Sequence, residues 1–281
     1  MASGDTFVTS VDAGLPTMVA AARRRNQFPT DVMQRVVDRQ SLPPGTGTSY
    51  REFLAENLTA QNYGETDDIE NPQEITGSIL SATPQLVAIM TFIGDRVPLR
   101  LDRKAFAQFG ELGQEAMERK GDTDGHAMFA SATTTVGATA TTLSYSNADW
   151  AVQRIRSDAT EPGKEPIAIV LHGYGIHDIR NELIAGVSTY PVPNGYSEEV
   201  FKNGFRGSIN GANVYHDGLI AVDSTPDARG GVFAKRGILM VVGKPPWTAT
   251  QNMPGKGYGG KRVWLKSEYV FAERSSGNWL Y

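Results

Sequence analysis

The amino-acid sequence predicts an α+β protein built from several distinct parts. Residues 86–93 alternate β-branched and other apolar side chains with a period of two, which is typical of a strand. Residues 102–120 instead place apolar side chains three and four positions apart, which indicates one long helix. After residue 145, short helical segments alternate with short apolar strands, so helices and strands both contribute to the fold.

The overall composition favours a folded protein with a sizeable core. The chain has 281 residues, of which 40% are hydrophobic, and this excludes wholesale disorder. Its net charge of −4 lacks the basic excess of a nucleic-acid-binding domain. Cysteine is absent, which excludes disulfides, thiolate catalysis and cysteine-based metal sites. No apolar run approaches ~18 residues and no signal-peptide pattern is present, so we expect no membrane partner and assembly in the cytoplasm.

Residues 1–33 carry no strong period and are expected to form an N-terminal arm. Pro16 and Pro29 interrupt any regular element. The basic triplet Arg23, Arg24 and Arg25 has two interpretations. It forms either a solvated turn or a contact with phosphate or with acidic groups of a neighbouring subunit.

Residues 34–96 predict an extended β-ribbon with a polar, acidic tip. The tip carries Glu65, Asp67 and Asp68. A ribbon of this kind is marginally stable alone in water, and long connections without a partner are rare inside compact domains. We therefore expect the ribbon to lie on another copy of the chain, with the tip acids as candidate contacts to a basic patch there.

The helix predicted at 102–120 has signals at both ends. Asp102 can cap its start, and its apolar stripe includes Phe106, Phe109 and Met117. Lys120 and Gly121 indicate its end. The stripe is interpreted as core packing.

Helices and strands alternate after residue 140. A helix capped by Ser146 or Asn147 is expected to bury Trp150, Ala151 and Ile155. A buried strand and a second helix follow, and then come a third helix, three strands, a Pro- and Gly-rich loop and an aromatic-rich extended tail. Their expected bounds, in order, are 167–171, 176–185, 196–204, 212–217, 218–223, 237–243, 244–262 and 263–281.

The segment IAIVLHGYGIHDIRNE, residues 167–182, raises the question of an enzyme. In α/β hydrolases a His-Gly turn after a buried strand supplies N–H groups to an oxyanion hole. The chain has no Gly-x-Ser-x-Gly elbow, because GVSTY around Ser188 lacks the second glycine and follows a helix. We assign no catalytic residue.

Three ligand-binding patterns also fail. GKGYGGKR has Arg262 where a phosphate loop needs Ser or Thr. DTDGH lacks the acidic residues that begin and end a calcium loop. GFRGSINGANVYHD has the wrong glycine spacing for a dinucleotide loop. We expect no cofactor and no metal.

Three stretches, in this order, carry a resemblance to a known family: YSNADWAVQRI, IAIVLHGYGIHDIRNEL and GFRGSINGANVYHDGLI. The chain resembles the major capsid proteins of tailed double-stranded DNA bacteriophages, which have the HK97-like capsid fold. Asp178-Ile179-Arg180 matches the end of an apical motif of these proteins, whereas Gly173 stands where they more often have proline.

The resemblance implies a division of the chain into four parts. They are an N-terminal arm at 1–33, an extended loop at 34–96, a peripheral domain at 97–139 and 246–281 with a spine helix at 102–120, and an apical domain at 140–245. Asp178 and Arg180 of the apical domain are candidate contacts within or between subunits.

The resemblance also implies self-assembly rather than catalysis. Copies of the chain would form pentamers and hexamers of an icosahedral shell, the virion capsid, which encloses the phage DNA. Implied partners are a separate scaffolding protein, a portal, a decoration or cement protein, and packaged DNA held non-specifically on the inner face. The alternative function is that of an encapsulin-like bacterial nanocompartment shell, and the remote alternative is an α/β hydrolase-like enzyme.

Overall fold

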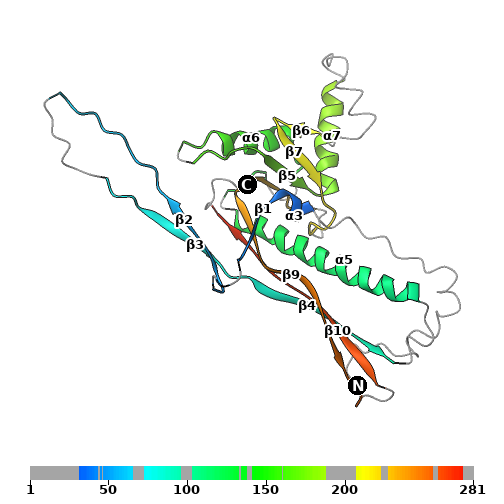
Figure 1. Cartoon of the computed structure of the whole chain (residues 1–281). Coiled ribbons are helices and arrows are strands. Elements are labelled where there is room, and N and C mark those ends of the chain that lie inside the picture. The colour runs from blue at the N-terminus through cyan, green and yellow to red at the C-terminus, as the bar shows by residue number, and fades with distance from the viewer. Residues whose placement is uncertain are drawn as a thin grey trace.

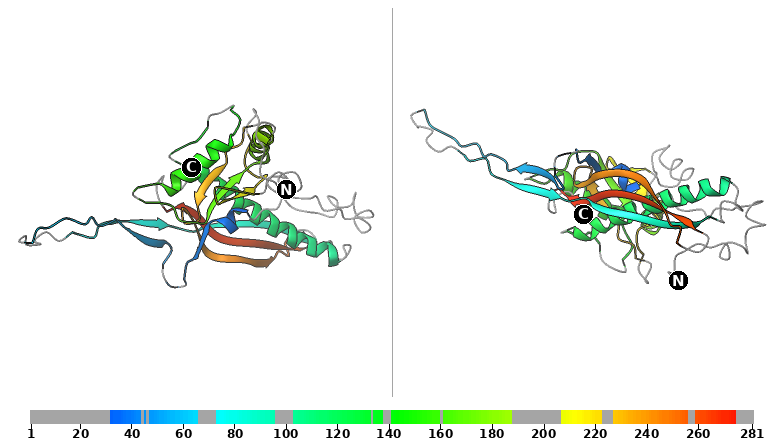
Figure 2. Two further views of the ribbon diagram at one scale, coloured as in Figure 1. Left: turned by 90° about the horizontal axis from the view of Figure 1, so that it is seen from above. Right: turned by 60° about the horizontal axis from the view of Figure 1, so that its bottom comes forward.

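The computed structural model shows a long ribbon, a four-stranded sheet with a helix along it, and a smaller α/β unit (Figure 1). Figure 2 shows the ribbon projecting far beyond the rest of the molecule. The structure describes residues 32–43, 45, 47–65, 73–95, 103–132, 134–137, 141–159, 161–187, 207–222, 227–255 and 259–274.

The four-stranded sheet has the order β1-β9-β10-β4. These strands span Asp38–Ser41, Ile238–Asn252, Gly260–Glu273 and Gln85–Gly94. Strand β1 is parallel to β9, and the other neighbours are antiparallel. The predicted strand at 86–93 is therefore confirmed as β4, and the predicted extended tail is confirmed as β10 up to Glu273. The last part of that tail, 275–281, lies outside the described residues.

Strand β9 continues through Pro245 and Pro246, although a loop is predicted there. Proline lacks the N–H that a strand ladder needs. The two prolines face a single residue of β10, Ser267, and so form a bulge, while β1 has already ended opposite Val242. Neither proline has to donate a backbone hydrogen bond to a neighbouring strand, so β9 extends to Asn252. The predicted loop is therefore wrong from 244 to 252.

Helix α5, Arg103–Ala127, runs seven residues past the predicted end at Lys120. Gly121 and Gly125 allow a close approach rather than a stop, because they pack against α3, Val32–Val36. A Cβ atom at Gly125 would lie 2.9 Å from Cβ of Met33, and one at Gly121 would lie 2.9 Å from Nε2 of Gln34. A 3₁₀ turn at Met128–Ser131 follows α5.

Among the described residues, the smaller unit is a four-stranded sheet of order β6-β7-β5-β8 together with helices α6 and α7. Every residue of β5 is buried, in agreement with its apolar run. The strands β5, β6, β7 and β8 span Ile167–Leu171, Ser208–Ile209, Ala212–His216 and Gly231–Ala234, and the helices α6 and α7 span Tyr145–Arg156 and Gly173–Val187.

Several predictions for this unit are wrong in detail. Ser144 rather than Ser146 or Asn147 caps α6, and Trp150 is 48% exposed, because the buried stripe runs through Ala148, Ala151, Val152 and Ile155. Helix α7 begins at Gly173 instead of residue 176. In the described part of the predicted strand at 218–223, which is 218–222, no strand forms, and Val222 makes an isolated bridge to Ala228. The expected helix at 196–204 lies outside the described residues.

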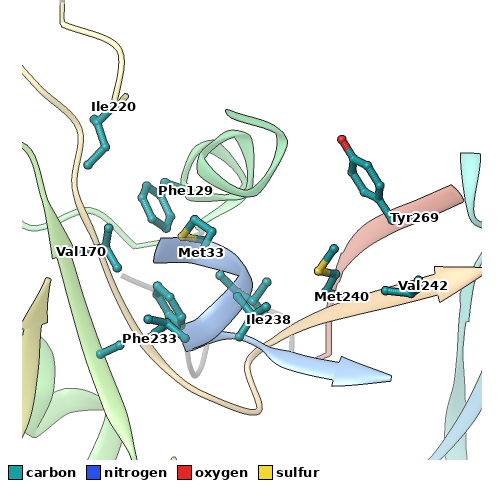
Figure 3. Close-up of a cluster of buried hydrophobic side chains, with 12 residues drawn as sticks. Met33, Phe129, Val170, Ile220, Phe233, Ile238, Met240, Val242 and Tyr269 are labelled. Atoms are coloured by element: carbon teal, nitrogen blue, oxygen red, sulfur yellow. The ribbon is translucent and has the colours of Figure 1, made fainter. Parts of the chain in front are cut away.

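One hydrophobic core joins the two sheets. Figure 3 shows Val170 and Phe233 of the smaller sheet near Met33 of α3, with Ile238 and Met240 of β9 on the other side. Because a single core holds both sheets, their relative placement follows from packing.

The ribbon is a separate two-stranded sheet. Strands β2, Tyr50–Ala55, and β3, Gly77–Ala82, pair in an antiparallel register. The ribbon is narrower than the predicted range 34–96, because β1 and β4 belong to the large sheet.

Candidate assembly surface

The ribbon exposes a pair of large apolar side chains. Phe53 and Ile79 lie directly opposite each other across β2 and β3, and they are 57% and 66% exposed. The Phe53 ring also covers Gly77, where a Cβ atom would lie 2.6 Å from Cζ of the ring. Burying a side chain of this size stabilises an interface by roughly 1.5–3 kcal/mol, so the pair favours a surface that covers it.

Hydrogen bonds keep the ribbon together beyond its strands. The Glu56 N–H donates to the Thr76 carbonyl at 2.9 Å, and the Thr76 hydroxyl donates to the Glu56 carboxylate at 2.7 Å. Further out, the Thr59 N–H donates to the Gln73 side chain at 2.9 Å. Leu58, Tyr63 and Ile75 are exposed along this part. An extended chain from residue 50 to 65 spans about 50 Å, so the ribbon reaches well beyond its own subunit.

The ribbon is also strongly acidic. Residues 50–82 contain seven acidic side chains and one basic side chain, Arg51. The whole chain has 31 acidic and 27 basic residues, which leaves 24 acidic and 26 basic residues outside the ribbon. A partner surface for the ribbon should therefore be apolar and basic.

Arg274 fixes the root of the ribbon to the large sheet. Its side chain is 8% exposed, and it donates to Glu52 of β2 at 3.0 Å and to Asp38 of β1 at 2.7 Å. Burial alone lowers the pKa of Arg274, but the hydrogen bond to Asp38 and the charge of Glu52 outweigh burial and raise it above its usual range. A charged arginine thus ties the ribbon to the end of β10.

The predicted contact residues lie in different places. Glu65 lies in a turn near the ribbon tip, whereas Asp67, Asp68, Arg23, Arg24 and Arg25 fall outside the described residues. These six residues stay candidate contacts.

Asp178 and Arg180 lie on α7. The Asp178 carboxylate accepts a hydrogen bond from the Leu143 N–H at 3.4 Å, which is a contact within the subunit. Arg180 is half-buried two residues further on, and residues at this spacing do not face each other on a helix. The structure therefore does not bring these two side chains together.

The His-Gly turn at 172–175 starts helix α7. The Tyr174 N–H donates to Nδ1 of His172 at 3.2 Å, so this turn uses that donor internally. A Cβ atom at Gly173 would lie 3.0 Å from Nε2 of His216, which gives a physical reason for glycine at this position. Burial and the neighbouring His216 lower the pKa of His172.

A buried pair joins α5 to the smaller unit. Nε2 of His126 lies 3.0 Å from the Asp217 carboxylate, and both side chains are almost fully buried. The Asp217 N–H donates to the Leu171 carbonyl at the end of β5 at 3.0 Å. No local sequence pattern indicates this pair, because 91 residues separate the two side chains.

No arrangement for metal binding or membrane crossing stands out in the described part of the chain. Its His, Asp and Glu side chains form no group of three or more that could hold a metal ion. Within the same residues, no helix has both the length and the apolar composition to cross a membrane.

Comparison with known proteins shows what this architecture is similar to. No family model and no curated protein matches the sequence. Solved structures match almost the whole chain. The capsid of the cyanophage P-SCSP1u matches with a TM-score of 0.68 at 10% identity, over 92% of this chain and 90% of that one.

Two further structures agree with this likeness. A protein of Mycobacterium phage Che8 has a TM-score of 0.70 at 11% identity and covers 92% of this chain and 93% of its own. The mature capsid of bacteriophage PhiM1 has a TM-score of 0.65 at 13% identity, over 92% and 88% of the two chains. These matches confirm the predicted α+β class, and the chain has the HK97-like fold of phage capsid proteins.

Proposed function

We propose that the protein is a major capsid protein, which self-assembles into pentamers and hexamers of an icosahedral shell around the phage DNA. The observation that carries the proposal is the ribbon. It leaves Phe53 and Ile79 uncovered on a chain with a capsid fold. A two-stranded ribbon is marginal in water, and a neighbouring copy in a shell supplies the missing surface.

The proposal gives the protein a structural role in the virion capsid, without catalysis. Obligate assemblies commonly bury more than ~2,000 Å² per interface, and a ribbon of about 50 Å offers area of this kind. A separate scaffolding protein, a portal and a decoration or cement protein belong to the proposed partners. Packaged DNA would meet the inner face non-specifically, and the net charge of −4 is consistent with weak binding there.

Electron microscopy of native particles and of the purified protein, with and without a scaffolding protein, tests the proposal. Icosahedral shells that contain DNA in native particles are the expected result. Small shells filled with protein would support the nanocompartment function instead. A stable monomer that never assembles, even with scaffold, and that hydrolyses model esters would contradict both shell functions.

A further inference from the structure

Helix α7 begins with a histidine cap. His172 lies between the end of β5 and Gly173, the first residue of α7. Its carbonyl accepts the Ile176 N–H at 3.2 Å, and its ring nitrogen Nδ1 accepts the Tyr174 N–H at 3.2 Å. These are the two contacts of an N-cap residue, whose side chain accepts from the second or third amide of the helix. His172 therefore has the role that serine, threonine, asparagine or aspartate usually has.

A histidine cap differs from the usual caps because its acceptor atom can take up a proton. The imidazole accepts at Nδ1 only while it is neutral and carries its proton on Nε2, whereas imidazolium is a donor at both nitrogens. Protonation would therefore remove the acceptor of the Tyr174 N–H. It would also place a positive charge at the N-terminus of α7, where the helix dipole is itself positive. Both effects act against the first turn of the helix.

The surroundings of His172 favour the neutral, capping form. His216 at the end of β7 lies beside the start of α7, because a Cβ atom at Gly173 would lie 3.0 Å from its Nε2. Burial of the ring and then the charge of His216 lower the pKa of His172, whereas the charge of Asp217 acts in the opposite direction. The folded chain therefore holds the cap in its accepting state at neutral pH.

The Asp217 carboxylate is already engaged by other groups. Its Oδ2 lies 3.0 Å from Nε2 of His126 on α5, and its Oδ1 accepts the Leu219 N–H at 2.8 Å. The charge of Asp217 is thus shared between His126 and His172. A proton on His172 would add a positive charge beside His216 that Asp217 compensates only in part.

The other segments around the cap add little opposite charge. The segment 141–144 packs against the first turn of α7 through Leu143 and has no ionisable side chain. Arg229, in the segment that packs against the end of β5, is a further cation. Beyond the first turn, the next ionisable residues of α7 are His177 and Asp178, and the Asp178 carboxylate accepts the Leu143 N–H at 3.4 Å.

The body of α7 is held independently of the cap. Ile179 is fully buried in a cluster with Leu171 of β5, and Ile176 packs against the same cluster. The Glu182 carboxylate accepts the Tyr145 N–H at 2.6 Å and so joins α7 to the start of α6. Loss of the cap would therefore open the first turn and leave the rest of the helix in place.

We propose that His172 is a proton-sensitive switch, in which mild acid breaks the hydrogen bond from Tyr174 and opens the first turn of α7. The step is the transfer of one proton from solvent to Nδ1, and it changes no covalent bond of the chain. Opening releases the turn between β5 and α7 from its contact with His216, and a return to neutral pH restores the cap. The switch is a property of the single subunit, so it does not rest on the proposed shell function.

Hydrogen exchange resolved to single amides, in the full-length unassembled subunit, tests the switch. The measured quantity is the protection factor, which corrects the exchange rate for its intrinsic dependence on pH. An N-cap of typical strength corresponds to roughly a fivefold change in the opening equilibrium, so protection of the Tyr174 N–H should fall about fivefold from about pH 7.5 to about pH 5. The Asn147 N–H of α6 is the internal control, because the Ser144 hydroxyl that holds it does not titrate in this range.

Three variants separate the cap from other effects of acid. His172→Asn keeps an acceptor at the cap but does not take up the proton, so its protection should be equal at both pH values. His172→Ala removes the acceptor and should give low protection at both. His177→Asn changes an exposed histidine further along α7 and should keep the dependence of the wild type. Circular dichroism verifies that each variant is folded.

The nitrogen resonances of the His172 ring give a second readout. At neutral pH, Nδ1 should show the chemical shift of a nitrogen without a proton, and in acid both ring nitrogens should be protonated. His216→Asn should move this transition to higher pH, because His216 lowers the pKa of His172.

Three results would overturn the proposal. They are an equal fall of protection in the wild type and in His172→Asn, full protection of the wild type at about pH 5, and full protection of His172→Ala at about pH 7.5. None of them bears on the proposed function, which electron microscopy of particles decides separately.

Discussion

Replacing Arg274 by methionine should weaken the attachment of the ribbon and destabilise the subunit. Methionine keeps the apolar packing of the arginine stem but removes the donors to Asp38 and Glu52. A hydrogen bond to a charged group contributes about 1.5–3 kcal/mol. Breaking a fully buried ion pair costs about 3–5 kcal/mol, whereas an exposed pair contributes only about 0–1 kcal/mol.

The exposure of the two carboxylates places this case between those limits. The side chains of Asp38 and Glu52 are 23% and 30% exposed, so water can hydrate each of them after Arg274 is lost. We therefore expect the free energy of unfolding to fall by about 2–3 kcal/mol, which lowers the melting temperature by roughly 5–10 °C for a protein of this size.

Urea unfolding of the unassembled subunit, followed by tryptophan fluorescence, measures this change. The matched control is Arg154→Met on α6, an exposed arginine whose loss should change stability by less than about 0.5 kcal/mol. In an Arg274→Met background, Glu52→Gln should cost less than it does alone. Equal stability of Arg274→Met and Arg154→Met would refute the role of Arg274 as the link between ribbon and sheet.

Three further predictions concern packing, pH and assembly. Gly231→Ala should destabilise the subunit by about 1–3 kcal/mol, because the new Cβ atom would lie 2.5 Å from the Phe129 ring. Gly110→Ala, in open space on α5, should stabilise the subunit slightly. Thermal melts compare the two variants. The pKa of His172 is lowered in the folded state, so the folded state binds fewer protons than the unfolded state below about pH 6.5. The free energy of unfolding should therefore fall as the pH drops. Urea midpoints measured from pH 7 to 5 should decline less in His172→Asn than in the wild type. Phe53→Asp should leave subunit stability within about 0.5 kcal/mol of the wild type yet abolish shells in sedimentation; normal shells would contradict a covered ribbon.

Periodic apolar patterns predicted the strands in which the burial of the side chains follows the sequence pattern. The alternation in 86–93 identified β4, and the unbroken apolar run at 167–171 identified the fully buried β5. In both strands the local pattern and the tertiary environment agree, so the sequence alone was sufficient.

The predicted ends of elements are wrong at glycine and proline residues that have another role in tertiary packing. Gly121 was interpreted as a helix stop but allows the close approach of α3. Pro245 and Pro246 were interpreted as a loop but form a bulge that needs no ladder bond. Such positions depend on a partner element that lies far away in the sequence, and periodicity carries no information about it.

The candidate contacts were only partly accessible to sequence reasoning. The acidic ribbon was recognisable from composition alone, and so was its need for a partner surface. The face of the large sheet that α5 leaves open was not recognisable, because it depends on the pairing of β4, β9 and β10 and on which side α5 occupies. Arg274 was missed for a similar reason, since its partners lie 222 and 236 residues away.

A high-resolution electron-microscopy reconstruction of the assembled wild-type particle tests the central claim most directly. The measured quantity is the exposed fraction of Phe53 and Ile79 in the particle, compared with 57% and 66% in the isolated subunit. We expect both side chains to be buried against a neighbouring copy in an icosahedral shell. A particle in which the ribbon lies free in solvent, or a protein that remains monomeric under all assembly conditions, would contradict the account.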